Sequence, residues 1–161
     1  MLMFQTERLI AKSHMTLVEG LLQPGVVANQ NIIDIFSNDF DKKVDTQMCD
    51  SFVFFDITQP IVPVCYIEYF KKRDRHELHW ETFEEFRKCG YMTEALTAFI
   101  QWAKMNTKDK HLWALINQGN TPSIKTAHRC GFVVTDKNSE GTKWYKATLD
   151  CPAKQVLEET L

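Results

Sequence analysis

The chain has 161 residues, 44% of them hydrophobic and 25% charged, a composition that suits one globular domain over residues 1–161. A formal net charge of -2 excludes the basic surface field that favours nucleic acids or anionic membranes as partners. Five widely spaced cysteines and five scattered histidines predict neither a disulfide framework nor a metal site. No apolar run suits a signal peptide or a membrane span, so we expect a cytoplasmic protein, either monomer or homodimer.

The first half of the chain is predicted to consist mainly of strands. Aromatic and β-branched residues gather in short runs separated by polar turns, a pattern typical of strands and hairpins. Between the first two runs, residues 15–50 contain apolar clusters broken at Pro24 and Gly25, which predict one or two short helices. The basic residues 71–75 are interpreted as a solvated turn. The predicted strands are residues 5–13, 52–57, 62–70 and 76–82.

An amphipathic helix is predicted after Gly90, because apolar residues recur there at the spacing of one helix face. Residues 112–116 then form an all-apolar run typical of a buried strand. The apolar face of the helix comprises Met92, Ala95, Leu96, Phe99, Ile100 and Ala103.

A second helix is expected to begin at Thr121 as its cap, with Pro122 in its first turn and Gly131 as a left-handed exit residue. Residues 132–135 and 143–149 predict a closing hairpin. Strands outnumber helices, and two strand-helix-strand units occupy the second half. We therefore expect a mixed α/β sheet with helices on both faces.

Residues 86–93 run from a strand end into the amphipathic helix and suit an anion. The first amides of a helix lack internal partners, Gly90 lets the backbone curl, and Arg87 and Lys88 add positive charge. The alternative interpretation is an ordinary turn with two solvated cations. Neither phosphate-loop motif of nucleotide-binding proteins fits, because Gly90 is the only glycine near the turn.

A second motif, residues 117–123, begins the second helix, and with it the sequence resembles the GCN5-related N-acetyltransferase (GNAT) superfamily, in particular its RimJ/RimL-like branch. The resemblance covers most of the chain. It is carried by residues 6–9 at the start of the first strand, residues 90–96 at the pyrophosphate turn, and residues 120–124 with 130–132 at the second CoA element.

The resemblance implies a GNAT fold, an α+β architecture with a mostly antiparallel twisted sheet of about six to seven strands. It also implies acetyl-CoA as co-substrate, without a metal. Asn120 matches the residue that contacts the pantetheine arm, and Ser123 matches a nearby hydroxyl. Met92 and Lys88 depart from the family pattern, which has small residues there. The turn that would hold the CoA pyrophosphate comprises Arg87, Lys88, Cys89, Gly90, Tyr91, Met92 and Thr93.

Acetyl transfer to an amine requires a proton acceptor, a stabilised carbonyl oxygen and a proton for the leaving thiolate. By resemblance, backbone amides near residues 80–82 would meet the oxygen. Glu81 is the first candidate base, and a water relay is an alternative; Glu84, Glu85 and His79 are the further side-chain candidates. The tyrosine that many family members use as the acid is replaced by Ala127, which leaves Ser123; a helix-capping hydroxyl is the alternative interpretation.

We therefore expect an enzyme that moves an acetyl group to a primary amine, such as a protein amino terminus or a small amine. A GNAT-fold module that binds acyl-CoA or a partner without turnover remains the alternative, because of Lys88, Met92 and Ala127. Cys89, beside a helix start and two cations, is an alternative nucleophile for an acyl-enzyme, or a packing residue. The aromatic residues Trp80, Phe83, Phe86 and Tyr91 suit either an acceptor pocket or the core.

Overall fold

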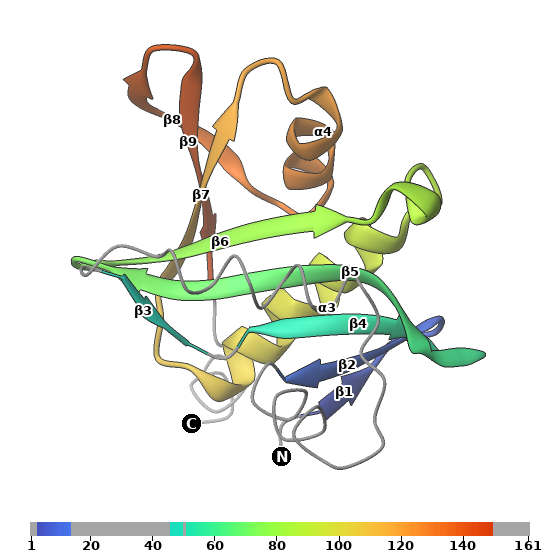
Figure 1. Cartoon of the computed structure of the whole chain (residues 1–161). Coiled ribbons are helices and arrows are strands. Elements are labelled where there is room, and N and C mark those ends of the chain that lie inside the picture. Colours follow the sequence, from blue (N-terminus) through green and yellow to red (C-terminus); the bar gives the residue numbers. More distant parts are fainter. Residues whose placement is uncertain (1–2, 14–45, 50, 150–161) are drawn as a thin grey trace, which may run out of the picture.

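The computed structural model describes residues 3–13, 46–49 and 51–149, which build one twisted sheet with helices packed against it (Figure 1). Eight strands lie in the order β1-β2-β4-β5-β6-β7-β9-β8, and β3 pairs with β5. The elements are β1 Met3–Gln5, β2 Leu9–Ser13, β3 Thr46–Met48, β4 Phe52–Asp56, β5 Gln59–Lys72, β6 Arg75–Thr82, the 3-10 turn η1 Glu84–Phe86, α3 Tyr91–Asn106, β7 His111–Asn117, α4 Thr121–Arg129, β8 Val133–Ser139 and β9 Thr142–Thr148.

The amino-terminal strand expected over residues 5–13 is instead a tight hairpin of β1 and β2. Thr6 causes the break: its amide donates to the Leu9 carbonyl at 2.8 Å, and its hydroxyl oxygen accepts from the Leu9 amide at 2.9 Å. A threonine side chain that bonds a backbone amide a few residues on favours a turn over a continuous strand. Residues 6–8 are therefore the loop that joins β1 and β2.

Strands β4 and β5 confirm the predicted hairpin, and their side chains alternate between two faces. Phe52 and Phe54 enter the main core, whereas Val53 and Phe55 belong to a smaller cluster on the opposite face. In the region expected to be helical, residues 46–48 form the strand β3. The expected helices of residues 15–50 otherwise fall almost entirely outside the described residues.

Strands β6 and β7 are the one parallel pair in the described sheet, and they separate almost at once. Their ladder contains a single pair, Glu77 with Trp113. The connection between them is α3, the predicted amphipathic helix, which crosses the sheet and buries its apolar face, including Leu96 and Phe99. Beyond Glu77 the two strands diverge (Figure 1).

Helix α4 confirms the second predicted helix, with one correction at its start. The cap is Asn120, not Thr121: the Asn120 side chain accepts a hydrogen bond from the Ser123 amide at 3.3 Å. Gly131 adopts the expected left-handed conformation, with φ of +87°. The closing hairpin of β8 and β9 follows as predicted, with longer strands.

Helices α3 and α4 both pack into the main core cluster, where Ala127 of α4 is fully buried with Phe99 and Phe132. The α+β, mostly antiparallel fold expected from the sequence is confirmed. The sheet has nine strands rather than six or seven, because the short strands β1 and β3 carry too few residues for a sequence pattern. No helix in the described part of the chain is long and apolar enough to cross a membrane.

Candidate active site

The turn before α3 presents backbone amides to one side. Lys88 and Gly90 both have positive φ, 62° and 78°, and α3 begins at Tyr91. The amides of residues 88–93 have no hydrogen-bond acceptor among the described residues, and no side chain caps the helix. Free amides at the positive end of a helix dipole form a site that favours an anion.

Lys88 occupies a conformation that only glycine adopts without steric cost. Its φ of 62° lies in the left-handed region, which costs other residues about 1 kcal/mol. Its side chain is exposed. Arg87 is partly held back from the turn: its Nε donates to the Thr82 carbonyl at 3.1 Å, and its Nη2 lies 3.9 Å from Glu81 Oε1.

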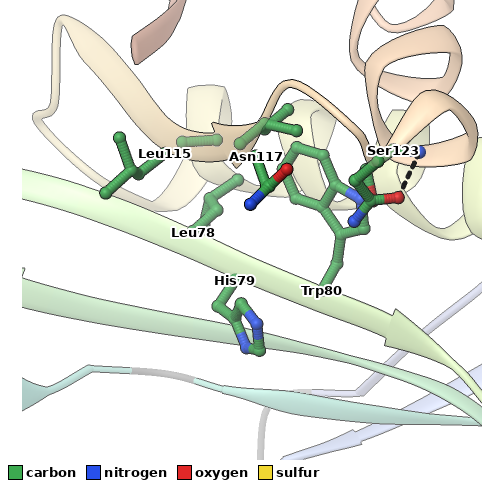
Figure 2. Close-up of a pocket in the computed structure, with 9 residues that line it drawn as sticks. Leu78, His79, Trp80, Leu115, Asn117 and Ser123 are labelled. Atoms are coloured by element: carbon green, nitrogen blue, oxygen red, sulfur yellow. Dashed lines mark hydrogen bonds between the residues drawn. The ribbon is translucent and has the colours of Figure 1, made fainter. Parts of the chain in front are cut away.

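Between β6 and β7 lies a pocket of about 220 Å³, which we call the slot (Figure 2). Its lining comprises residues of both strands together with Asn120 and Ser123 at the start of α4. Trp80 and Ser123 lie toward α4, whereas His79 points to the opposite face (Figure 2). The lining residues are Leu78, His79, Trp80, Ala114, Leu115, Ile116, Asn117, Asn120 and Ser123.

One edge of this slot consists of free backbone groups of β6. The Phe83 amide donates to the Val64 carbonyl of β5 at 3.0 Å. Amide directions alternate along an antiparallel strand, so the amides of Trp80 and Thr82 point away from β5 and toward the slot. This is the neighbourhood expected from the sequence to meet a carbonyl oxygen.

The predicted base Glu81 lies on β6 outside the pocket lining. Its Oε2 accepts a 2.7 Å hydrogen bond from the Tyr66 hydroxyl, and its side chain is about half exposed. His79, on the same face of β6, lines the pocket, with Nδ1 3.9 Å from Oε1 of the buried Glu68. Glu84 and Glu85 lie exposed in η1.

The other residues that the sequence singled out differ in their burial and in their position relative to the slot. Cys89 is exposed in the turn, with its thiol 3.4 Å from the Arg87 carbonyl, and it does not line the slot. Met92 is buried, so its large side chain packs in the core and does not fill the turn. Ala127 is fully buried as well. Of the aromatic set, Trp80 packs on Phe132 with ring centres 5.7 Å apart and also lines the slot.

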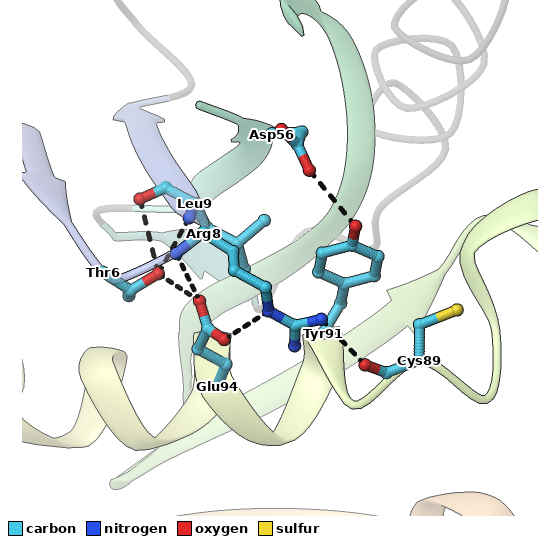
Figure 3. A network of polar contacts seen from close by, with 7 residues as sticks. All are labelled: Thr6, Arg8, Leu9, Asp56, Cys89, Tyr91 and Glu94. Carbon is cyan, nitrogen blue, oxygen red and sulfur yellow. Dashed lines mark hydrogen bonds and ion pairs between the residues drawn. The ribbon is translucent and has the colours of Figure 1, made fainter. Parts of the chain in front are cut away.

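Sequence reasoning missed the network behind the turn (Figure 3). Arg8 bonds the side chain of Glu94 at 2.8 Å and the carbonyl of Cys89 at 3.0 Å, and the Tyr91 hydroxyl donates to Asp56 at 3.1 Å. Hydrogen bonding to Glu94 raises the pKa of Arg8, and burial together with the Asp56 hydrogen bond raises that of Tyr91. The likeness of residues 6–9 to a family motif was the one available signal.

Among the described residues, no three histidine, cysteine, aspartate or glutamate side chains lie close enough together to hold a metal ion. The described chain thus offers two features to a ligand: free amides at the start of α3 and a pocket between β6 and β7. The free amides suit an anion such as a diphosphate group.

Comparison with known proteins identifies the class. The sequence model of the acetyltransferase (GNAT) domain matches residues 25–133, more than half of the chain. The chain therefore belongs to the GNAT acetyltransferase family. No curated protein matches its sequence.

Solved structures of acetyltransferases share this fold at low sequence identity. An acetyltransferase from Agrobacterium tumefaciens has a TM-score of 0.64 and 17% identity, covering 91% of this chain and 94% of its own. Spermidine N-acetyltransferase from Vibrio cholerae, in complex with CoA and spermine, has a TM-score of 0.62 and 10% identity, covering 89% and 97%. RimL, a ribosomal alpha-N-protein acetyltransferase in complex with coenzyme A, has a TM-score of 0.62 and 12% identity, covering 93% and 99%.

Proposed function

We propose that this protein transfers an acetyl group from acetyl-CoA directly to a primary amine, either a protein amino terminus or a small amine. Two features carry the proposal: the free amides of residues 88–93 and the slot between β6 and β7. The CoA-bound relatives, one titled as acting on spermidine and one on a ribosomal protein, support it.

The proposed CoA site follows the two features in order. The diphosphate binds the amides of the turn, where Arg87 and Lys88 add charge, and the pantetheine arm enters the slot past Asn120 and Ser123. The backbone of Cys89, Gly90, Tyr91, Met92 and Thr93 completes the turn. The side chain of Met92 lies in the core and leaves its amide available.

The proposed reaction is a single displacement. The neutral amine attacks the thioester carbonyl carbon, a C–N bond forms, and the C–S bond breaks. The amides of Trp80 and Thr82 donate to the carbonyl oxygen as negative charge develops. Glu81 takes the proton from the amine nitrogen, with His79 as the competing base, and the Ser123 hydroxyl gives its proton to the CoA thiolate. Cys89 belongs to the turn that would hold the diphosphate rather than the thioester, which supports direct transfer rather than an acyl-enzyme.

We place the acceptor on the face that carries His79 and Glu81, because His79 lines the slot and points to the face opposite α4 (Figure 2). CoA would then enter from the side of α4, and the two substrates would meet between the strands. The cytoplasmic location, and the choice between monomer and homodimer, stay predictions from the sequence. The second candidate function, acyl-CoA binding without turnover, is favoured by the replacement of the family tyrosine by Ala127.

The deciding experiment measures CoA release from acetyl-CoA across a panel of small amines and peptides with free amino termini. Turnover with one class of amine is the expected result. Binding of CoA by calorimetry without release of thiol for any amine would favour the binding module. Ser123→Ala tests the role of Ser123 as the proton donor to the thiolate, and Glu81→Gln tests the role of Glu81 as the base. If neither change lowers the activity, these two roles are wrong, whereas the proposed activity is not contradicted.

A further inference from the structure

The loop between β1 and β2 reaches across to the start of α3 and holds Glu94. Oε2 of this carboxylate accepts from the Thr6 hydroxyl at 2.5 Å and from the Arg8 amide at 3.0 Å, while Oε1 accepts from Arg8 Nε at 2.8 Å (Figure 3). Glu7, between them, is exposed. The carboxylate thus fixes both the backbone and the guanidinium of Arg8.

The same guanidinium also contacts the turn before α3. Nη1 donates to the Cys89 carbonyl at 3.0 Å, and the guanidinium carbon lies 4.3 Å from the centre of the Tyr91 ring. Nη2 would lie 3.6 Å from a β-carbon on Gly90. Arg8 therefore contacts Cys89 and Tyr91 and lies close to Gly90 between them.

The contact with the Cys89 carbonyl decides where the next amide points. The carbonyl of one residue and the N–H of the following residue belong to the same planar trans peptide and point in opposite directions. Because Arg8 holds the Cys89 carbonyl, the Gly90 amide faces away from Arg8. Glycine resists rotation of this peptide less than any other residue, so an external brace has an effect here.

We infer that Arg8, fixed by Glu94, is a positioning residue that orients the Gly90 amide for the diphosphate of CoA. The inference rests on the proposed CoA site, and it assigns no contact between Arg8 and the ligand. A second explanation, that Arg8 acts only as a nearby positive charge, makes a different prediction. A lysine at position 8 would keep the charge but could not bond Glu94 and the Cys89 carbonyl in the same fork geometry.

The test compares Arg8→Lys and Arg8→Met with two controls, Glu7→Gln in the same loop and Lys12→Met on β2. Lys12 lies over the Phe55 ring and donates to the Pro60 carbonyl, away from the turn, so its replacement removes the same charge elsewhere. Calorimetry measures the Kd for CoA at a temperature where thermal unfolding shows each variant folded. Turnover is measured with acetyl-CoA and with S-acetylpantetheine, which lacks the diphosphate.

We expect both Arg8 variants to bind CoA about tenfold more weakly, the loss of one charged hydrogen bond, and both controls to bind as the wild type does. The KM for acetyl-CoA should rise with kcat retained, whereas kcat/KM for S-acetylpantetheine should stay unchanged. A general loss of structure would instead lower kcat/KM for both acetyl-CoA and S-acetylpantetheine. Wild-type affinity in Arg8→Lys would overturn the positioning role alone; a wild-type protein that binds no CoA would overturn the proposed site as well.

Discussion

The Tyr66 hydroxyl donates a 2.7 Å hydrogen bond to Oε2 of Glu81, its partner across β5 and β6. The other carboxylate oxygen of Glu81 lies 3.9 Å from Arg87 Nη2. The proposed base is therefore held between Tyr66 of the sheet and Arg87 of the turn before α3, at the face from which we expect the acceptor to approach. Its orientation depends on a tyrosine that no sequence motif marks.

Tyr66→Phe should lower kcat by roughly threefold to tenfold, because Glu81 loses the hydrogen bond that orients it. The KM for acetyl-CoA should not change, since Tyr66 lies away from the turn. Steady-state kinetics check this. His79→Gln is the matched comparison: a loss of activity in that variant with none in Tyr66→Phe or Glu81→Gln would assign the base to His79.

Lys88→Gly should stabilise the protein. Glycine relieves the strain of a φ of 62°, and a gain of about 1 kcal/mol raises the Tm by about 2–4 °C in a protein of this size. Lys88→Ala removes the same charge and keeps the strained backbone, so we expect no gain from it. Both variants should bind CoA more weakly than the wild type if the Lys88 charge contributes. Equal Tm values for the two variants would contradict the strain argument.

Asn120→Ala should cost about 1 kcal/mol of stability, because the Ser123 amide loses its cap. Asn120→Ser retains a capping oxygen but shortens the side chain that faces the slot. We expect near-normal thermal unfolding for Asn120→Ser together with a raised KM for acetyl-CoA. If the KM for acetyl-CoA rises only in Asn120→Ala, the variant that loses stability, Asn120 acts only as a helix cap.

The described cysteines should differ sharply toward a thiol reagent. Burial raises the pKa of Cys65, which is fully buried, and also that of Cys130, whereas Cys89 is exposed in the turn. Peptide mass spectrometry after brief labelling should find Cys89 modified well before Cys65. Bound CoA should slow the labelling of Cys89 and leave that of Cys130 unchanged; equal protection of both would argue against CoA at the turn.

The contribution of Glu94 to stability should depend on pH. Burial raises its pKa, but hydrogen bonds from Thr6 and Arg8 outweigh this effect and place the pKa below the ordinary value of 4.5. A lowered pKa in the folded state means that ionised Glu94 stabilises the protein fully above about pH 4.5. This stability is lost as the pH falls through the lower folded value. The Tm difference between the wild type and Glu94→Gln should therefore narrow in acid, and a constant difference would contradict the prediction.

Several elements were predictable because their signals are local. The apolar face of α3 repeats over several turns, and Gly131 must leave α4 in a left-handed conformation. Neighbours within one helix or one turn determine both features. The hairpin of β4 and β5 and the turn before α3 were predictable for the same reason. The break at Thr6 was missed, since a single hydroxyl decides it and alternation alone cannot distinguish one strand from two.

The sequence by itself determined the family, the order of most described elements and the turn that presents free amides, because each depends on residues close together in the chain. Only the tertiary structure decided that Arg8 braces this turn, that Tyr66 holds Glu81, and that His79 and Ser123 line one slot. Arg8 and Glu94 are 86 positions apart. Contacts of that kind depend on how strands pair and diverge, and strand pairing is a property of the whole sheet rather than of any segment.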